Sequence, residues 1–163
     1  NGRGNVFSNT VSFFKQFNRD SSLAAAEKFL KYKTEYVGNA PKVGNIIYLL
    51  AFPEKVSYDH FELYTDSVPY AVTVYLMTDT QTINYYAQTL DQSLFEKNAI
   101  IMFSLIGNVD YINFNLTDGK SDYLVQYTRD DANAIIGRDV REFSEGKQEF
   151  AELLKKLDAI KEN

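Results

Sequence analysis

The chain has 163 residues, 45% of them hydrophobic and 24% charged, with a formal net charge of −5. This size and balance are typical of a globular domain with a substantial core. The acidic charge argues against a nucleic-acid partner, because phosphate neutralisation needs clustered Lys and Arg. No cysteine is present, which excludes disulfides, thiol nucleophiles and thiolate metal sites. The apolar runs have about eight residues at most, too few to cross a bilayer.

Residues 1–20 are predicted to be a lead-in or juxtamembrane segment, and residues 21–163 a single domain. After a loop-like start comes an aromatic-rich stretch at roughly helical spacing, formed by Phe7, Val11, Phe13, Phe14 and Phe17. This stretch fits a short helix that docks on the domain, and it equally fits the membrane-proximal end of an anchor. Because the chain begins with Asn1 and not with Met, we expect a targeting or anchoring segment that lies before it.

Two helices are predicted before the first strand. Asp20-Ser21-Ser22 offers N-cap side chains, and the helix formers of Leu23 to Lys33 follow. The stretch from Thr34 to Gly44 is rich in Gly, Asn and Pro and is predicted to be a loop. The next apolar segment, Val43 to Phe52, is predicted to be a helix with Pro41 in its first turn.

Two hairpins are predicted from alternating apolar and polar residues. Residues 61–65 and 70–77 alternate on either side of a turn at Asp66-Ser67-Val68-Pro69. Residues 112–116 and 123–127 alternate on either side of Asp118-Gly119, which is the strongest short hairpin signal.

Further helices lie between and after these hairpins. Ile83 to Phe95 is predicted to be helical or partly irregular, and it leads into Ala99 to Ile106, a buried helix that Gly107-Asn108 closes as a glycine C-cap. Arg129-Asp130-Asp131 begins a short helix that Gly137 ends. The C-terminal amphipathic helix is marked by Phe150, Leu153, Leu154, Leu157 and Ile160.

The predicted order is therefore α-α-β-β-α-β-β-α-α. Two hairpins in this order predict an α+β fold, with a four-stranded antiparallel sheet that helices cover on at least one face.

Few residues offer catalytic or metal-binding chemistry. His60 is the only histidine, and we interpret it as a surface residue, since a catalytic triad or a metal site would need partners from other segments. Gly38 and Gly44 flank a loop before a helix but lack the lysine of a phosphate-binding loop. Asp130 and Asp131 are best explained as helix-capping residues. We therefore expect no catalytic residues, no metal and no cofactor.

Three blocks of sequence resemble a known family. They are Tyr32 to Asn39 followed by Val43 to Ile47, Leu63 to Asp66 followed by Pro69-Tyr70, and Asn98-Ala99 with Phe103 to Asp110. Together they resemble the DUF4825 family, a domain of unknown function from Gram-positive bacteria, over residues 29–143. Asn39 and Gly107 are the positions where the chain departs from the family's pattern.

The resemblance implies an extracytoplasmic domain that follows a transmembrane or lipoprotein anchor, in some proteins similar to antirepressor-type membrane sensors. It carries no established activity and no catalytic residues. We therefore expect a non-catalytic sensory or protein-interaction domain anchored to the cell membrane. Its expected partner is another membrane or cell-envelope protein, and its contact with the membrane would be made only through the anchor.

The candidate binding surface combines the loop from residue 36 to residue 45 with the turn from residue 67 to residue 70. Its residues are Tyr36, Gly38, Asn39, Asn45, Pro69 and Tyr70. Tyrosine supplies rigid aromatic contact area and asparagine supplies adaptable hydrogen bonds. A purely structural role, in which four of these residues lock the two turns together, is also consistent with the sequence.

Two other functions stay open. The 24 aromatic residues, 12 Tyr and 12 Phe, could line a pocket for a small ligand between sheet and helices, although they could equally fill the core. A hydrolase that uses carboxylates and tyrosine would need two facing acidic residues, and no spacing in the sequence indicates such a pair.

Overall fold

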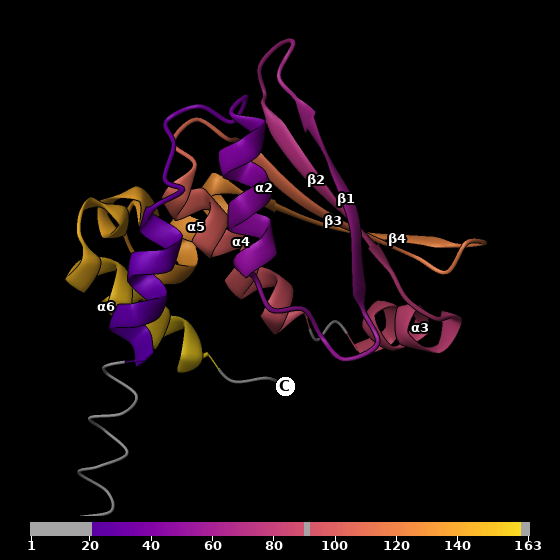
Figure 1. Ribbon diagram of the computed structural model, residues 1–163. Coiled ribbons are helices and arrows are strands. Elements are labelled where there is room, and N and C mark those ends of the chain that lie inside the picture. Colours follow the sequence, from indigo (N-terminus) through magenta and orange to yellow (C-terminus); the bar gives the residue numbers. More distant parts are fainter. Residues whose placement is uncertain (1–20, 90–91, 161–163) are drawn as a thin grey trace, which may run out of the picture.

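The computed structural model describes residues 21–89 and 92–160, so the prediction for residues 1–20 lies outside the described part. Helices and strands alternate in pairs along the chain (Figure 1). In order they are a helical segment at residues 21–30, α2 (Ala40–Leu49), β1 (Ser57–Tyr64), β2 (Ala71–Met77), α3 (Thr80–Thr89), α4 (Ser93–Leu105), β3 (Tyr111–Thr117), β4 (Asp122–Thr128), α5 (Arg129–Ile136), the 3-10 helix η1 (Val140–Glu145) and α6 (Lys147–Asp158).

The four strands form one sheet in the order β1-β2-β3-β4. Both predicted hairpins are present as antiparallel pairs, so the α+β fold with a four-stranded sheet is confirmed. The central pair is parallel, from Ala71 opposite Tyr111 to Met77 opposite Thr117, so the sheet is mixed and not wholly antiparallel as expected. The reason is the connection through α3 and α4, which is long enough to return the chain for parallel pairing.

The core lies between one face of the sheet and the helices, and α2, α4, α5 and α6 gather on that side, whereas α3 lies at one end of the sheet (Figure 1). The inward side chains of the central strands are fully buried, namely Val72, Val74, Leu76, Ile112, Phe114 and Leu116. Phe114 packs against Phe95 of α4, with ring centroids 5.5 Å apart. The predicted buried helix is confirmed as the C-terminal two thirds of α4, where residues 98–105 are all buried.

The end of α4 differs from the prediction. The C-cap is Ile106 in an extended conformation, and Gly107 does not adopt a left-handed conformation. The segment around Thr34 pairs here instead: the Thr34 N–H donates to the carbonyl of Leu105 (2.9 Å), and the Gly107 N–H donates to the carbonyl of Thr34 (2.9 Å). A Cβ at Gly107 would lie 3.2 Å from the Cα of Glu35. A glycine is therefore needed at position 107 because the backbone of Glu35 approaches closely.

The helix after β4 begins and ends largely as predicted. Thr128 and Asp131 form a capping box, which confirms the capping role of Asp131. Gly137 ends α5 in the left-handed conformation, with φ of 94°. The 3-10 helix η1 was not predicted. Its Phe143 is buried in the core, and the Asp139 side chain caps its start by accepting from the Arg141 N–H at 3.0 Å.

The other face of the sheet carries a row of polar side chains on adjacent strands. Asn113 donates from Nδ2 to Thr73 Oγ1 at 3.1 Å, and Gln126 donates from Nε2 to Asn113 Oδ1 at 2.9 Å. Cross-strand hydrogen bonds of this kind link β2, β3 and β4 on the face opposite the core.

Candidate interaction surface

Residues 107–110, which connect α4 to β3, hold both segments of the predicted binding surface. Asn108 Oδ1 accepts the N–H of Val37 at 2.7 Å, and Asp110 Oδ2 accepts the N–H of Tyr70 at 2.7 Å. The Tyr70 carbonyl in turn accepts from the N–H groups of Asp110 (2.9 Å) and Tyr111 (3.1 Å). We call residues 107–110 the connector. The two predicted segments are therefore anchored to one short piece of chain.

Tyr36 projects from a fixed backbone. The Thr34 hydroxyl lies 3.2 Å from both the N–H and the carbonyl of Tyr36, and the next side chain, Val37, is buried. The Tyr36 side chain itself is 71% exposed. Its neighbour Gly38 has open space where a Cβ would stand and no left-handed φ, so nothing in its surroundings requires glycine.

Asn39 and Asn45 each have a local partner. Asn39 is the N-cap of α2, and its side-chain oxygen accepts the N–H of Lys42 at 3.2 Å. Asn45 donates from Nδ2 to the carbonyl of Pro41 at 2.8 Å, at an exposed position. Capping explains Asn39 without a ligand, whereas the Asn45 side chain remains accessible.

The turn between β1 and β2 borders an open groove of about 500 Å³ at the start of α5. Val68, which is 70% exposed, is one of the residues that line it. Tyr70 packs against the core and contributes its backbone to the connector instead. The groove is lined by Val68, Pro69, Asp110, Tyr111, Thr128, Arg129 and Asp130. Of the two predicted binding residues in this turn, Pro69 and Tyr70, Pro69 is thus the one that lines the groove.

The Arg129 side chain holds the connector and the end of α4 in place through hydrogen bonds to their carbonyls. The sequence did not predict this role. The guanidinium donates to the carbonyls of Phe103 (2.8 Å), Ile106 (2.8 Å) and Val109 (3.0 Å). It also lies over the Phe103 ring, 5.2 Å from the centroid. Burial lowers the pKa of Arg129 to about 10. An arginine at the first position of a helix gave no signal of this contact, because its partners lie 20 or more residues away.

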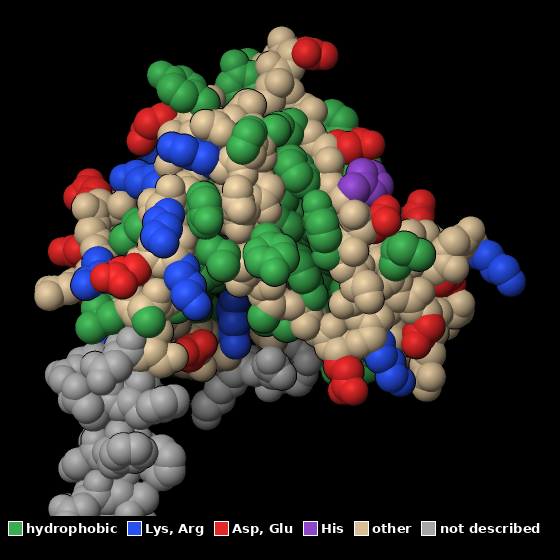
Figure 2. Space-filling view, in the orientation of Figure 1, with side chains coloured by type: hydrophobic (Ala, Val, Ile, Leu, Met, Phe, Trp, Pro, Cys, Tyr) green, Lys and Arg blue, Asp and Glu red, His purple; other side chains and the backbone are tan. Residues whose placement is uncertain are grey.

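His60 lies on the exposed edge strand β1. Its Nδ1 is 2.6 Å from Asp59 Oδ2, and its ring stacks on Tyr75 at 4.4 Å. Glu62 accepts hydrogen bonds from Tyr64 (2.7 Å) and Tyr75 (3.2 Å), and the Tyr64 bond is the main cause of the lowered pKa of Glu62. Figure 2 shows this histidine at the surface beside acidic side chains. Among the described residues, no three His, Asp or Glu side chains are placed to hold a metal ion.

The aromatic residues mostly fill the core. Phe95, Phe103, Phe114, Phe143 and Phe150 are among the largest fully buried side chains. A cavity of about 270 Å³ lies among the helices, and Phe29 is the one aromatic residue in its lining within the described part of the chain. This cavity therefore differs from the aromatic pocket between sheet and helices that the sequence left open as an alternative.

No helix within residues 21–89 and 92–160 is long and apolar enough to cross a membrane. Comparison with curated proteins and with solved structures finds no significant match. A family model does match: the domain of unknown function DUF4825, over residues 29–128. The matched region runs from the end of the first helical segment to the last residue of β4, so it contains the whole sheet and the connector. The chain therefore belongs to the DUF4825 family.

Proposed function

We propose that this chain is a non-catalytic sensory or protein-interaction domain of a membrane-anchored Gram-positive protein, and that it acts outside the cytoplasm. Its partner is another membrane or cell-envelope protein. The surface that binds this partner comprises Tyr36, Val68 and Pro69, and we call it the paired-loop surface.

The observation that carries the proposal is the anchoring of two exposed side chains to one connector. Tyr36 and Val68 are about equally exposed, at 71% and 70%, and hydrogen bonds that the backbone N–H groups of Val37 and Tyr70 donate to Asn108 and Asp110 fix the backbones beside them. Single exposed apolar residues are common and need no explanation. Two of them on preordered loops favour binding, because little conformational entropy is lost when a partner covers them.

The surroundings of Val68 have the composition of an interface. Asp110, Thr128 and Asp130 place polar groups around the groove next to Val68 and Pro69. A small apolar centre with a polar rim is the usual anatomy of a protein–protein contact. The open groove also gives a partner side chain a place to insert, which is how binding energy concentrates at interfaces.

The extracytoplasmic location rests on the family resemblance, which implies an anchor before the domain, and it is in keeping with a chain that has no cysteine. Protease treatment of intact cells tests it directly. In cells that express the full-length gene product with a tag after residue 163, we expect the tag to be digested without lysis. Protection of the tag until the cells are lysed would reject this location.

Site-specific photo-crosslinking in the native host tests the paired-loop surface. A photoreactive amino acid at position 36 or position 68 is expected to give a covalent adduct of the same mass. The matched control is position 48 on α2, since Tyr48 is also highly exposed, at 85%, but lies outside the surface. Adducts of equal yield at all three positions would indicate nonspecific contact. No adduct at positions 36 and 68, with the protein folded and correctly located, would reject the surface.

A further inference from the structure

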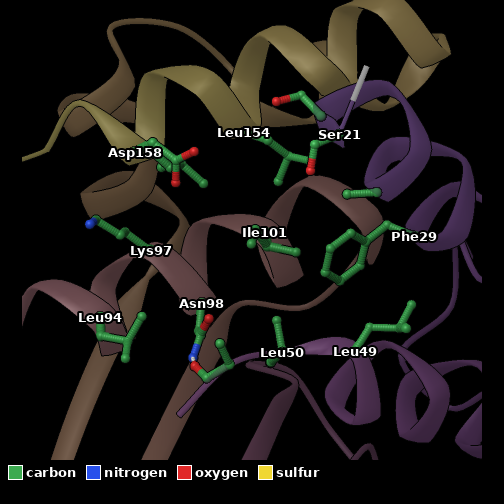
Figure 3. A pocket seen from close by; sticks show the side chains of 14 residues that line it. Ser21, Phe29, Leu49, Leu50, Leu94, Lys97, Asn98, Ile101, Leu154 and Asp158 are labelled. Atoms are coloured by element: carbon green, nitrogen blue, oxygen red, sulfur yellow. Dashed lines mark hydrogen bonds between the residues drawn. The ribbon is translucent and has the colours of Figure 1, made fainter. Parts of the chain in front are cut away.

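The cavity among the helices has the shape and chemistry of a binding site. It lies between the helical segment at residues 21–30, the end of α2, α4 and α6, and it holds about 270 Å³ (Figure 3). This volume is just below the range of about 300–1,000 Å³ that is typical of ligand pockets.

The cavity wall is mainly aliphatic. Leu49 and Leu50 from α2 and its C-cap face Ile101 of α4 and Leu154 of α6, and Phe29 adds one aromatic ring. Flexible methylene chains adapt to an irregular aliphatic wall, whereas a flat aromatic ligand gains most from stacking on other rings. The wall therefore favours an alkyl chain over an aromatic ligand.

Asn98 provides a buried polar group in this wall. Its side chain is 2% exposed and lies between those of Lys97 and Leu50 (Figure 3). Its Nδ2 donates to the carbonyl of Ala51 at 2.8 Å, which fixes the amide orientation because only the nitrogen can donate. No hydrogen bond to its Oδ1 is found among residues 21–89 and 92–160, and no fully buried side-chain oxygen in that part of the chain lacks a partner, so this oxygen is in contact with the open space of the cavity. A ligand that donates a hydrogen bond would satisfy this oxygen.

Charges of both signs lie at the edge of the cavity. Lys97 and Asp158 both line it, on the same side in Figure 3. An anionic head group would be attracted by Lys97 and repelled by Asp158, and a cationic one would meet the reverse. An uncharged head group avoids both penalties.

We propose that this cavity binds a medium-chain aliphatic amphiphile with an uncharged head group that donates a hydrogen bond to Asn98, the chemistry of a fatty alcohol or a monoacylglycerol. The site is separate from the paired-loop surface, since it lies at the middle of α4 and the connector lies beyond that helix's C-terminal end. The experiment on this cavity therefore does not depend on the proposed protein partner, and either proposal can fail alone.

The experiment measures binding of monooctanoylglycerol to the full chain by titration calorimetry, below the concentration at which the probe aggregates. We expect saturable binding with one site. Ala25→Phe fills the cavity from the helix at residues 21–30 and should weaken binding at least tenfold. Ala24→Phe is the matched control, because Ala24 lies on the same helix but is exposed and does not line the cavity. It should change the affinity less than twofold.

The role of Asn98 is tested by changing the ligand and not the protein. Methyl octanoate has the same acyl chain without a hydroxyl donor, and we expect it to bind roughly tenfold more weakly. Equal affinities for the two esters would overturn the assignment of Asn98, and equal binding by the Ala25→Phe and Ala24→Phe variants would overturn the site.

Absence of saturable binding to the full chain would also overturn the proposal. If Phe13→Asp together with Phe14→Asp then exposed a monooctanoylglycerol site that Ala25→Phe removes, the occupant of the cavity would be the chain's own residues 1–20. That result would show that a segment of this chain, and not a free amphiphile, occupies the cavity.

Discussion

Arg129 Nη2 lies 2.8 Å from the carbonyl oxygen of Ile106 and donates a hydrogen bond to it. This contact joins the first residue of α5 to the C-cap of α4, and the same guanidinium donates to three further carbonyls nearby. Carbonyls at a helix C-terminus lack partners within the helix. Arg129 therefore supplies the hydrogen bonds that α4 cannot make for itself.

We expect Arg129→Met to lower the free energy of unfolding by about 2–3 kcal/mol, because it leaves buried carbonyls without a donor. Arg129→Lys should recover part of this loss, since one ammonium cannot reproduce the planar fork. The measurement is urea denaturation at neutral pH. Arg138→Met is the control: it removes an exposed pair with Glu142 and a contact over the Phe143 ring, and should cost at most about 1 kcal/mol. Similar losses for both arginines would contradict the role of Arg129.

Removal of the Asn108 side chain should loosen the loop that carries Tyr36. Asn108→Ala leaves the Val37 N–H without its acceptor, at an expected cost of about 1–2 kcal/mol. Hydrogen exchange should show faster exchange of the Val37 amide, while amides in the middle of β3 change little. Asn45→Ala removes an exposed bond to Pro41 and should cost less than about 0.5 kcal/mol. Unchanged protection of Val37 would show that Asn108 does not hold the loop.

The pH dependence of stability should include a term from Glu96. Burial, and secondarily the charge of Asp131, raise the pKa of Glu96 above its usual value of 4.5. The folded state therefore holds this proton more tightly than the unfolded state, so stability falls as pH rises from 4.5 through the raised pKa.

Glu96→Gln should accordingly stabilise the protein at pH 7 and have little effect below pH 4.5. The expected gain is at most about 0.5 kcal/mol, because the side chain is partly solvated. Thermal unfolding across this pH range measures it. Glu152→Gln, which removes an exposed carboxylate on α6, corrects for the change in net charge. If Glu152→Gln raised the stability at pH 7 as much as Glu96→Gln does, the raised pKa of Glu96 would not be the cause of the gain.

Replacement by alanine should change the stability of the protein differently at two glycines. Gly119 in the second hairpin has φ of 88°, so Gly119→Ala should cost about 1 kcal/mol. Gly38→Ala meets open space and no left-handed backbone. It should leave stability unchanged or raise it by up to about 1 kcal/mol, through a less flexible unfolded chain. Chemical denaturation of the two variants compares them directly, and a large loss for Gly38→Ala would point to a need for glycine that the turn geometry does not show.

Local features of the fold could be predicted because neighbouring residues determine them. The alternation in both hairpins, the Asp118-Gly119 turn and the end of α5 at Gly137 were confirmed. Each depends on periodicity or on backbone preference within a few residues.

Features that depend on distant partners were not predicted. The parallel pairing of β2 with β3 joins strands separated by two helices, and Gly107 is explained by Glu35, which is remote in sequence. At the candidate surface, the sequence named exposed Tyr36 and the turn at Pro69. It could not predict the roles of Asn108 and Arg129, because a hydrogen bond between a side chain and a backbone group distant in sequence leaves no local pattern.

The parallel β2–β3 pair also has a consequence for synthesis on the ribosome. The first hairpin is complete once Met77 has emerged, but the inner edge of β2 cannot be covered until Thr117 follows. During that interval the nascent chain displays an unpaired strand rich in Val and Leu, the kind of edge that chaperones bind and that recruits other strands. Slow translation between these two residues would prolong the exposure, so codon choice over α3 and α4 should affect the yield of this domain more than codon choice elsewhere.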